Sequence, residues 1–320
     1  MPATLTEMFR TLTSFAPARV DLRDAPWEAY VDWAMGQGLA PLSAYNLEYR
    51  LGGAGAPEWA RDRLLSLYQG TLNDNVMKLV NFKRSVDDLE GRKVILLGAG
   101  SFAESLYPHV AFRPVIELRL LLAPADLDGF VGFMKGSDFK PQEPGEDAGT
   151  AERAVSDGRT LVLLHGKLTP DDDGLRARAL PMKVLGKSMF RLDLEDAILL
   201  FALLTSQAHF EVPMLEWLDL RELLLGSPAM GGVYSRDFDA AAILTRAKAW
   251  KLDRALYACL AIVGRLYPET AAAVARLEPS LNWPTRELID RLLVAQVAEI
   301  GRTQAFRLEA QVRELLTGTT

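Results

Sequence analysis

Hydrophobic and polar residues follow three different patterns along the 320-residue chain. Up to Gly91, apolar residues recur every three or four positions, as in PEWARDRLLSLYQGTLNDNVMKLVNFKRSVDDLEGRK, and this spacing predicts amphipathic helices. Between residues 92 and 190 the apolar residues form short runs instead, KVILL, VIELRLLL and TLVLLHGKL, which predict strands. The helical spacing returns from DLEDAILLFALLTSQAHF onward.

This order of elements predicts an α+β fold, in which a small mixed sheet is flanked by N- and C-terminal helical segments. The predicted regions are an N-terminal helical region at residues 1–91, an α/β core at 92–190 and a C-terminal helical region at 191–320. Two polar stretches are predicted to be loops: residues 142–159, QEPGEDAGTAERAVSDGR, and the acidic run at 171–173, which precedes a predicted hairpin.

The last long segment, residues 285–316, carries apolar residues along one broad face, from Leu288 to Leu315. We expect this face to pack on the body of the protein. The alternative interpretation is a homodimer contact through this C-terminal helix.

Composition and charge restrict the classes of partner. The formal net charge of -6 disfavours a broad nucleic-acid surface, although a small phosphate ligand needs only a local pocket. Cys259 is the single cysteine, so no disulfide can form within the chain, as is typical of a reducing compartment. The start MPATLTEMFRTLTSF lacks the pattern of a signal peptide, and no apolar run is long enough to span a bilayer. We therefore expect a cytoplasmic protein without a membrane partner.

Gly98-Ala99-Gly100 is the first candidate for chemistry, because it lies between a predicted strand and a predicted helix. With Ala103 it matches the G-x-G-x-x-A form of the dinucleotide fingerprint, so a dinucleotide-binding oxidoreductase is one alternative. The acid expected about 20 residues later could only be Glu117, which lies inside a predicted strand. A strand-to-helix turn that needs glycine for its backbone explains the same residues.

A longer pattern includes this turn. It comprises ILLGAGSFAESLYPHVAFRPVIELRLLLAPADL, with its Tyr107-Pro108 and Arg113-Pro114 steps, then TLVLLHGKL, and later LEWLDL. On these residues the stretch from Leu72 to about Pro268 resembles the bacterial uncharacterised nucleotidyltransferase family. The resemblance implies transfer of a nucleoside monophosphate, with two acids at i and i+2 on a strand and a third acid on a neighbouring strand holding divalent ions.

By the resemblance, Glu117 and Arg119 occupy the positions of the two strand acids, and Leu163 occupies the position of the third acid. The histidine of the family pattern is present here as His165, whereas Gly98 occupies the position of the family's lysine. One carboxylate of three therefore remains, and a guanidinium lies where metal would be held. We expect no metal here, and we expect Arg119 to pair with Glu117 as a built-in cation.

The candidate residues form two groups. The degenerate acid positions are Glu117 and Arg119, and the candidates for nucleotide binding are Gly98, Gly100, Ser101, Arg113 and His165. For Ser101 a helix N-cap is the competing interpretation, and for Arg113 it is a structural arginine that binds carbonyl groups.

The predicted function is that of a nucleotidyltransferase-like pseudoenzyme, acting as a binding or scaffold subunit in a bacterial biosynthetic pathway. Its partner would be a protein or a small-molecule nucleotide, with no cofactor. The main alternative is an active transferase that uses Mg²⁺ and relocated acids. Acids available for that role are Glu104, Asp126, Asp128 and the run Asp171–Asp173.

Overall fold

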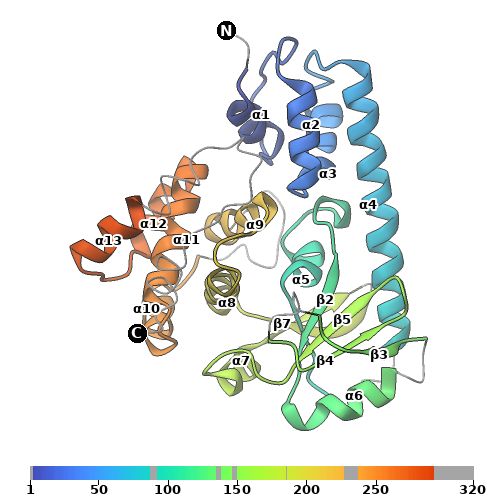
Figure 1. Ribbon diagram of the computed structural model, residues 1–320, viewed down its shortest axis with the longest axis vertical. Coiled ribbons are helices and arrows are strands. Elements are labelled where there is room, and N and C mark those ends of the chain that lie inside the picture. Colours follow the sequence, from blue (N-terminus) through green and yellow to red (C-terminus); the bar gives the residue numbers. More distant parts are fainter. Residues whose placement is uncertain are drawn as a thin grey trace.

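The computed structural model describes residues 3–86, 92–134, 138–145, 150–184, 186–226 and 237–291. Within these ranges, helices surround a seven-stranded mixed sheet, which confirms the predicted α+β class (Figure 1). All seven strands lie between Ile95 and Arg191.

The elements follow one another in three groups. The first group is α1 (Leu5–Leu12), α2 (Trp27–Gly36), α3 (Ala40–Tyr45), the π-helical turn η1 (Asn46–Arg50) and α4 (Glu58–Ser85). The second is β1 (Ile95–Leu97), α5 (Gly98–Ser105), η2 (Val110–Phe112), β2 (Glu117–Leu121), η3 (Pro124–Asp126), α6 (Leu127–Met134), β3 (Lys140–Gln142), β4 (Arg153–Ser156), β5 (Leu161–His165), α7 (Asp172–Arg178), β6 (Leu180–Val184) and β7 (Lys187–Arg191). The third is α8 (Leu194–Gln207), α9 (Met214–Leu225), α10 (Ala240–Ala249), α11 (Asp253–Leu266), η6 (Pro268–Thr270), α12 (Ala271–Arg276) and α13 (Trp283–Ile289).

The strand order across the sheet is β3-β4-β5-β2-β1-β7-β6. β2 lies in the middle, parallel to β5 and antiparallel to β1. β1 is in turn parallel to β7. The β1–α5–β2 unit therefore does not join parallel strands, as the βαβ unit of a dinucleotide fold must. The dinucleotide-fold alternative is wrong for this reason.

The two faces of β2 differ because its side chains alternate. Leu118 and Leu120 are fully buried and join a cluster that includes Phe82 of α4 and Phe130 of α6. Glu117 and Arg119 point to the opposite side and are partly exposed. This alternation turns the two charged positions away from the core between the sheet, α4 and α6.

α4 is the longest helix described, and it runs from the N-terminal helices down one side of the sheet (Figure 1). Pro57 precedes its first turn, where the missing amide hydrogen of proline is not needed. Glu58 lies in the first turn, and Lys83 and Arg84 lie in the last turn, where each charge opposes the helix dipole.

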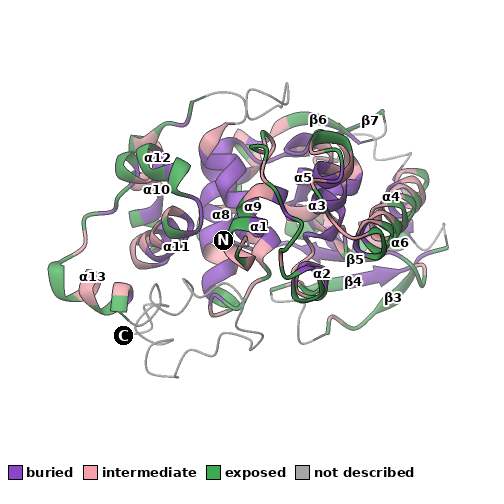
Figure 2. Ribbon diagram, turned by 90° about the horizontal axis from the view of Figure 1, so that it is seen from above, coloured by how far each residue is buried: buried purple, intermediate pink, exposed green. Residues whose placement is uncertain are grey.

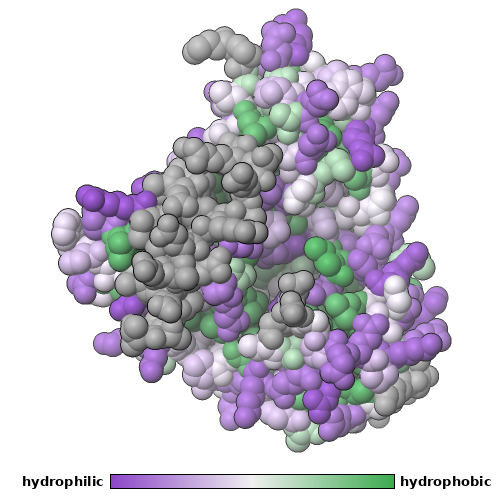
Figure 3. Space-filling view, viewed as in Figure 1, coloured by the Kyte–Doolittle hydropathy of each residue, from purple (hydrophilic) through white to green (hydrophobic). Residues whose placement is uncertain are grey.

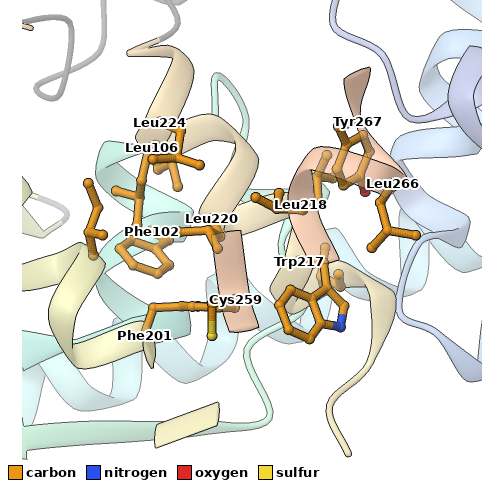
Figure 4. Packing of buried hydrophobic residues seen from close by; sticks show 14 of the residues in the cluster. Phe102, Leu106, Phe201, Trp217, Leu218, Leu220, Leu224, Cys259, Leu266 and Tyr267 are labelled. Carbon is orange, nitrogen blue, oxygen red and sulfur yellow. The ribbon is translucent and has the colours of Figure 1, made fainter. Parts of the chain in front are cut away.

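A second and larger core joins the N-terminal helices to the C-terminal ones. α8 and α9 lie in the middle and are buried along most of their length (Figure 2). Phe102 of α5, Phe201 of α8 and Leu220 of α9 meet in this core (Figure 4). Cys259 is fully buried beside them and belongs to the same core. Among the described residues, no helix is both long and apolar enough to cross a membrane.

Two predicted loops contain regular structure. The segment 142–159 contains β4, a short strand with Ala154 and Val155 as its buried apolar residues, so its sequence carried little strand signal. The acidic run at 171–173 is not a loop, because it begins α7: Asp171 is the N-cap and accepts a hydrogen bond from the Gly174 amide.

The predicted C-terminal helix is described only in part. α13 covers Trp283–Ile289, and residues 292–320 lie outside the described residues. The homodimer contact predicted for this segment therefore remains a prediction.

Candidate functional site

A cleft of about 640 Å³ lies where α5, β2 and α8 approach one another. Gly98 and Ala99 contribute the start of α5, Glu117 and Arg119 contribute charge from β2, and Phe201 of α8 belongs to a mostly apolar wall. In the space-filling view, hydrophobic residues border a hollow near the centre of this face (Figure 3). The cleft thus brings the degenerate acid positions and the glycine turn together.

Glu117 and Arg119 form an ion pair inside the cleft. Oε1 of Glu117 lies 2.5 Å from Nη2 and 2.6 Å from Nε of Arg119. The contact is local, because residues i and i+2 of a strand share one face. Each side chain keeps roughly a quarter of its surface exposed (23% for Glu117, 24% for Arg119), so a ligand in the cleft can reach both. The predicted pairing of Arg119 with Glu117 is confirmed.

The position predicted for a third acid lies beside this pair. Leu163 of β5 is in register with Arg119, and Leu97 of β1 flanks Arg119 from the other side. Both leucines are buried, so the neighbouring strands carry apolar residues at the two positions in register with Arg119. Mg²⁺ prefers carboxylate and carbonyl oxygens. The three positions that the resemblance assigns to acids offer it one carboxylate, Glu117, which is already bound to a cation, so these residues do not fit the metal ions that the family's chemistry implies.

The acids considered as relocated metal ligands do not supply the missing carboxylates. The run Asp171–Asp173 is occupied by the cap and by ion pairs of α7. Asp128 pairs with Arg153, and Asp126 ends η3. Glu104 lies in the second turn of α5. Within the described ranges, no three His, Cys, Asp or Glu side chains gather as a metal site would require.

Backbone geometry and packing explain the two glycines of the turn Gly98-Ala99-Gly100. Gly98 has φ +51°, a left-handed conformation that favours glycine. A Cβ on Gly100 would lie 2.7 Å from Leu118 Cδ2, so this glycine lets α5 pack closely on the sheet. Ser101 is not the N-cap of α5, because the helix begins at Gly98. It is a buried residue within the helix, and it also lines the cleft.

Arg113 lies at the wall of the cleft and is fixed from behind. Its Nε donates to Asp219 Oδ2 at 2.9 Å, and its Nη2 donates to Glu216 Oε1 at 2.6 Å. Nη1 donates to the carbonyl of Pro114, and the Tyr107 hydroxyl donates to Asp219 Oδ1 at 2.7 Å. A phosphate could engage Arg113 only by displacing these partners. The carbonyl contact agrees with the structural interpretation of this arginine.

Burial governs the ionisation of this network. Desolvation raises the pKa of Asp219 to about 7, although the charge of Arg113 acts in the opposite direction. The same desolvation raises the pKa of Tyr107 well above its ordinary range. Sequence reasoning assigned no role to Glu216 and Asp219. The one signal was LEWLDL, which contains both acids.

His165 ends β5 as predicted, but it is fully buried and is not among the residues that line the cleft. Nδ1 lies 3.3 Å from the Thr150 hydroxyl, and Nε2 has no hydrogen-bond partner among the described residues. Burial, followed by the positive charge of Arg119, lowers the pKa of His165 to about 4. At neutral pH His165 is therefore an uncharged, buried residue.

Comparison with known proteins supports the resemblance to the nucleotidyltransferase family. A family model described as an uncharacterised nucleotidyltransferase matches residues 23–268, a range that contains the whole sheet, the cleft and α9. No curated protein matches the chain.

Proposed function

The chain belongs to the uncharacterised nucleotidyltransferase family, and we propose that it is a member that has lost two-metal catalysis and acts as a binding or scaffold subunit. The observation that carries this proposal is the Glu117–Arg119 ion pair, with Leu163 beside it in register. By the resemblance, these two residues occupy the positions of the two acids that the family's chemistry needs on this strand.

Electrostatics support the loss of catalysis. Two divalent ions bring about four positive charges into a small volume, and several carboxylates must compensate the lost hydration. Here the one carboxylate at the strand positions, Glu117, is already neutralised by Arg119, whose guanidinium would repel any metal ion. Removal of a single preorganised charge-stabilising group typically costs on the order of 10²- to 10³-fold in rate. We infer that the loss of two acids and the gain of a cation abolish transfer.

The charge balance of the cleft also bears on its occupant. Two arginines, Arg113 and Arg119, and three glutamates, Glu117, Glu211 and Glu216, line the cleft, and the buried Asp219 pairs with Arg113 from behind. No positive charge is left over to hold a triphosphate without metal. The mostly apolar wall favours an occupant that binds by shape and apolar contact. We therefore infer a protein segment or an uncharged ligand rather than a nucleoside triphosphate.

Pyrophosphate release with each labelled nucleoside triphosphate, in Mg²⁺ and in Mn²⁺, tests the proposal. The natural chain and Glu117→Gln should both stay at the background rate, and neither protein should become labelled. Transfer by the natural chain that Glu117→Gln abolishes would refute the proposal. A titration measures the occupant preference: a nucleoside should bind no more weakly than its metal-bound triphosphate, and clear preference for the triphosphate would contradict the inference from charge.

A further inference from the structure

A second pocket lies in the N-terminal helical region and shares no lining residue with the cleft. Its volume is about 380 Å³, and it is lined by Arg19, Val20, Arg50, Leu51 and Gly52. Two of its five lining residues are therefore arginines. We call it the two-arginine pocket.

The backbone on one side of this pocket is a glycine-rich loop, LGGAGA, at residues 51–56. Four consecutive residues have left-handed φ angles: Gly52 +59°, Gly53 +83°, Ala54 +42° and Gly55 +79°. The amide of Gly53 donates to Leu47 at 2.8 Å, and the carbonyl of Ala54 accepts from Leu22 at 3.0 Å, so the loop is fixed at both ends.

The Gly52 amide lies where the loop meets the pocket. In the described part of the chain this amide donates to no acceptor. A Cβ on Gly52 would contact nothing within 4 Å, so the space beside its backbone is open. Backbone amides in turns with left-handed residues are frequent donors to bound anions.

Carboxylates neutralise the other arginines around this loop. Arg23 pairs with Asp21 at 2.6 Å, and Arg61 pairs with Glu48 at 2.7 Å. Neither arginine of the two-arginine pocket has an ion-pair partner within the described ranges. The pocket therefore holds two positive charges that the chain does not balance, in a protein whose net charge is -6.

Arg50 is nevertheless oriented. Its Cζ lies 5.9 Å from the centre of the Tyr45 ring, a cation–π contact that positions the guanidinium without using its hydrogen-bond donors. The Tyr45 ring is itself fixed by Phe112, at 4.7 Å between ring centres. The π-helical turn η1 ends at Arg50, and such turns are frequent at functional sites.

We propose that the two-arginine pocket binds the phosphate group of a small phosphomonoester, with Arg19 and Arg50 bound to its oxygens and the Gly52 amide as a further donor. Arginine suits this ligand, because its planar donors match phosphate oxygens two at a time. The volume suits a small metabolite, since ligand pockets start at roughly 300 Å³. The site is independent of the cleft and of the function proposed for it.

Titrations of the ¹⁵N-labelled chain with glycerol 3-phosphate and with inorganic phosphate test this site, at an ionic strength balanced with chloride. Both ligands should shift the arginine Nε–H signals and the Gly52 amide signal saturably, and glycerol should not. Arg19→Gln and Arg50→Gln should each weaken binding by about tenfold, and the double variant should abolish it. The matched control is Arg159→Gln, an exposed arginine in the turn between β4 and β5, which should bind as the natural chain does.

Three results would overturn the proposal. The first is the absence of saturation beyond the chloride control, and the second is an unchanged affinity in the double variant. The third is binding to vesicles that contain phosphatidic acid without binding to glycerol 3-phosphate, because that outcome identifies a membrane surface rather than a metabolite. All variants change exposed side chains, so an unchanged melting temperature checks that each one is folded.

Discussion

Replacing Arg119 with aspartate should give the cleft an affinity for divalent metal. The substitution removes the guanidinium that binds Glu117 and places a second carboxylate two residues away on the same strand face. Two carboxylates on one face form the start of a Mg²⁺ site. Because the natural ion pair is partly exposed, its loss alone should cost at most about 1 kcal/mol of unfolding free energy.

The size of the metal effect follows from linkage. If the variant binds Mg²⁺ with a dissociation constant of about 1 mM, about 10 mM Mg²⁺ stabilises it by roughly 1.4 kcal/mol. For a chain of this size that corresponds to a rise of about 2 °C in melting temperature. The natural chain should show no rise, because Arg119 still occupies the position.

Thermal unfolding, with and without Mg²⁺ at constant ionic strength, measures the difference. Arg119→Gln is the matched control, because it removes the cation without adding a ligand, and its melting temperature should not respond to metal. Adding Leu163→Asp to the aspartate variant should increase the metal-dependent shift, although an acid at this buried position lowers the stability without metal. A natural chain that responds to Mg²⁺ as strongly as Arg119→Asp would refute the reasoning, as would an unresponsive Arg119→Asp.

Three further predictions concern the scaffold around the cleft. Asp219→Asn should lower the unfolding free energy in urea by about 3 kcal/mol, because Arg113, with its side chain only 4% exposed, loses its fully buried counter-charge; a loss under 1 kcal/mol would contradict this. Gly100→Ala should cost about 1–3 kcal/mol in the same assay through the clash with the sheet, whereas Gly132→Ala, in a helix with open space, should cost nothing; equal effects would refute the packing role of Gly100. Burial raises the pKa of Glu222 from 4.5 to about 7, so the folded state binds this proton more tightly than the unfolded state does. The unfolding free energy should therefore fall as the pH rises from about 4.5 to about 7. Glu222→Gln should flatten this pH profile, and an unchanged slope in the variant would contradict the assignment to Glu222.

Local geometry decided which parts of the fold the sequence could predict. VIELRLLL and TLVLLHGKL became β2 and β5 because their apolar residues suit a central, buried pair of strands. β4 escaped prediction because only Ala154 and Val155 among its residues are buried and apolar. α7 escaped because its acidic start is as typical of a solvated loop as of a capped helix.

The same distinction separates the site residues. The Glu117–Arg119 pair could be predicted because it needs nothing beyond the alternation of side chains in one strand. Arg113 pairs with Asp219, which lies more than a hundred positions later in the chain, and no local sequence pattern predicts such a contact. The two-arginine pocket could not be predicted from the sequence for a related reason, since Arg19 and Arg50 come together only in the packed N-terminal region.

The two concave sites differ in how far the chain balances their charge, and this difference predicts what each accepts. In the cleft, Arg119 and Arg113 are both neutralised by carboxylates of the chain itself, so a charged ligand would have to break an existing pair before it gained a new one. In the two-arginine pocket no carboxylate of the described residues competes for the guanidiniums, so an anion gains the full interaction. Apolar contact should therefore select the occupant of the cleft, and charge should select the occupant of the pocket. Raising the salt concentration from about 0.05 to 0.5 M should accordingly weaken binding at the pocket and leave binding at the cleft unchanged or stronger.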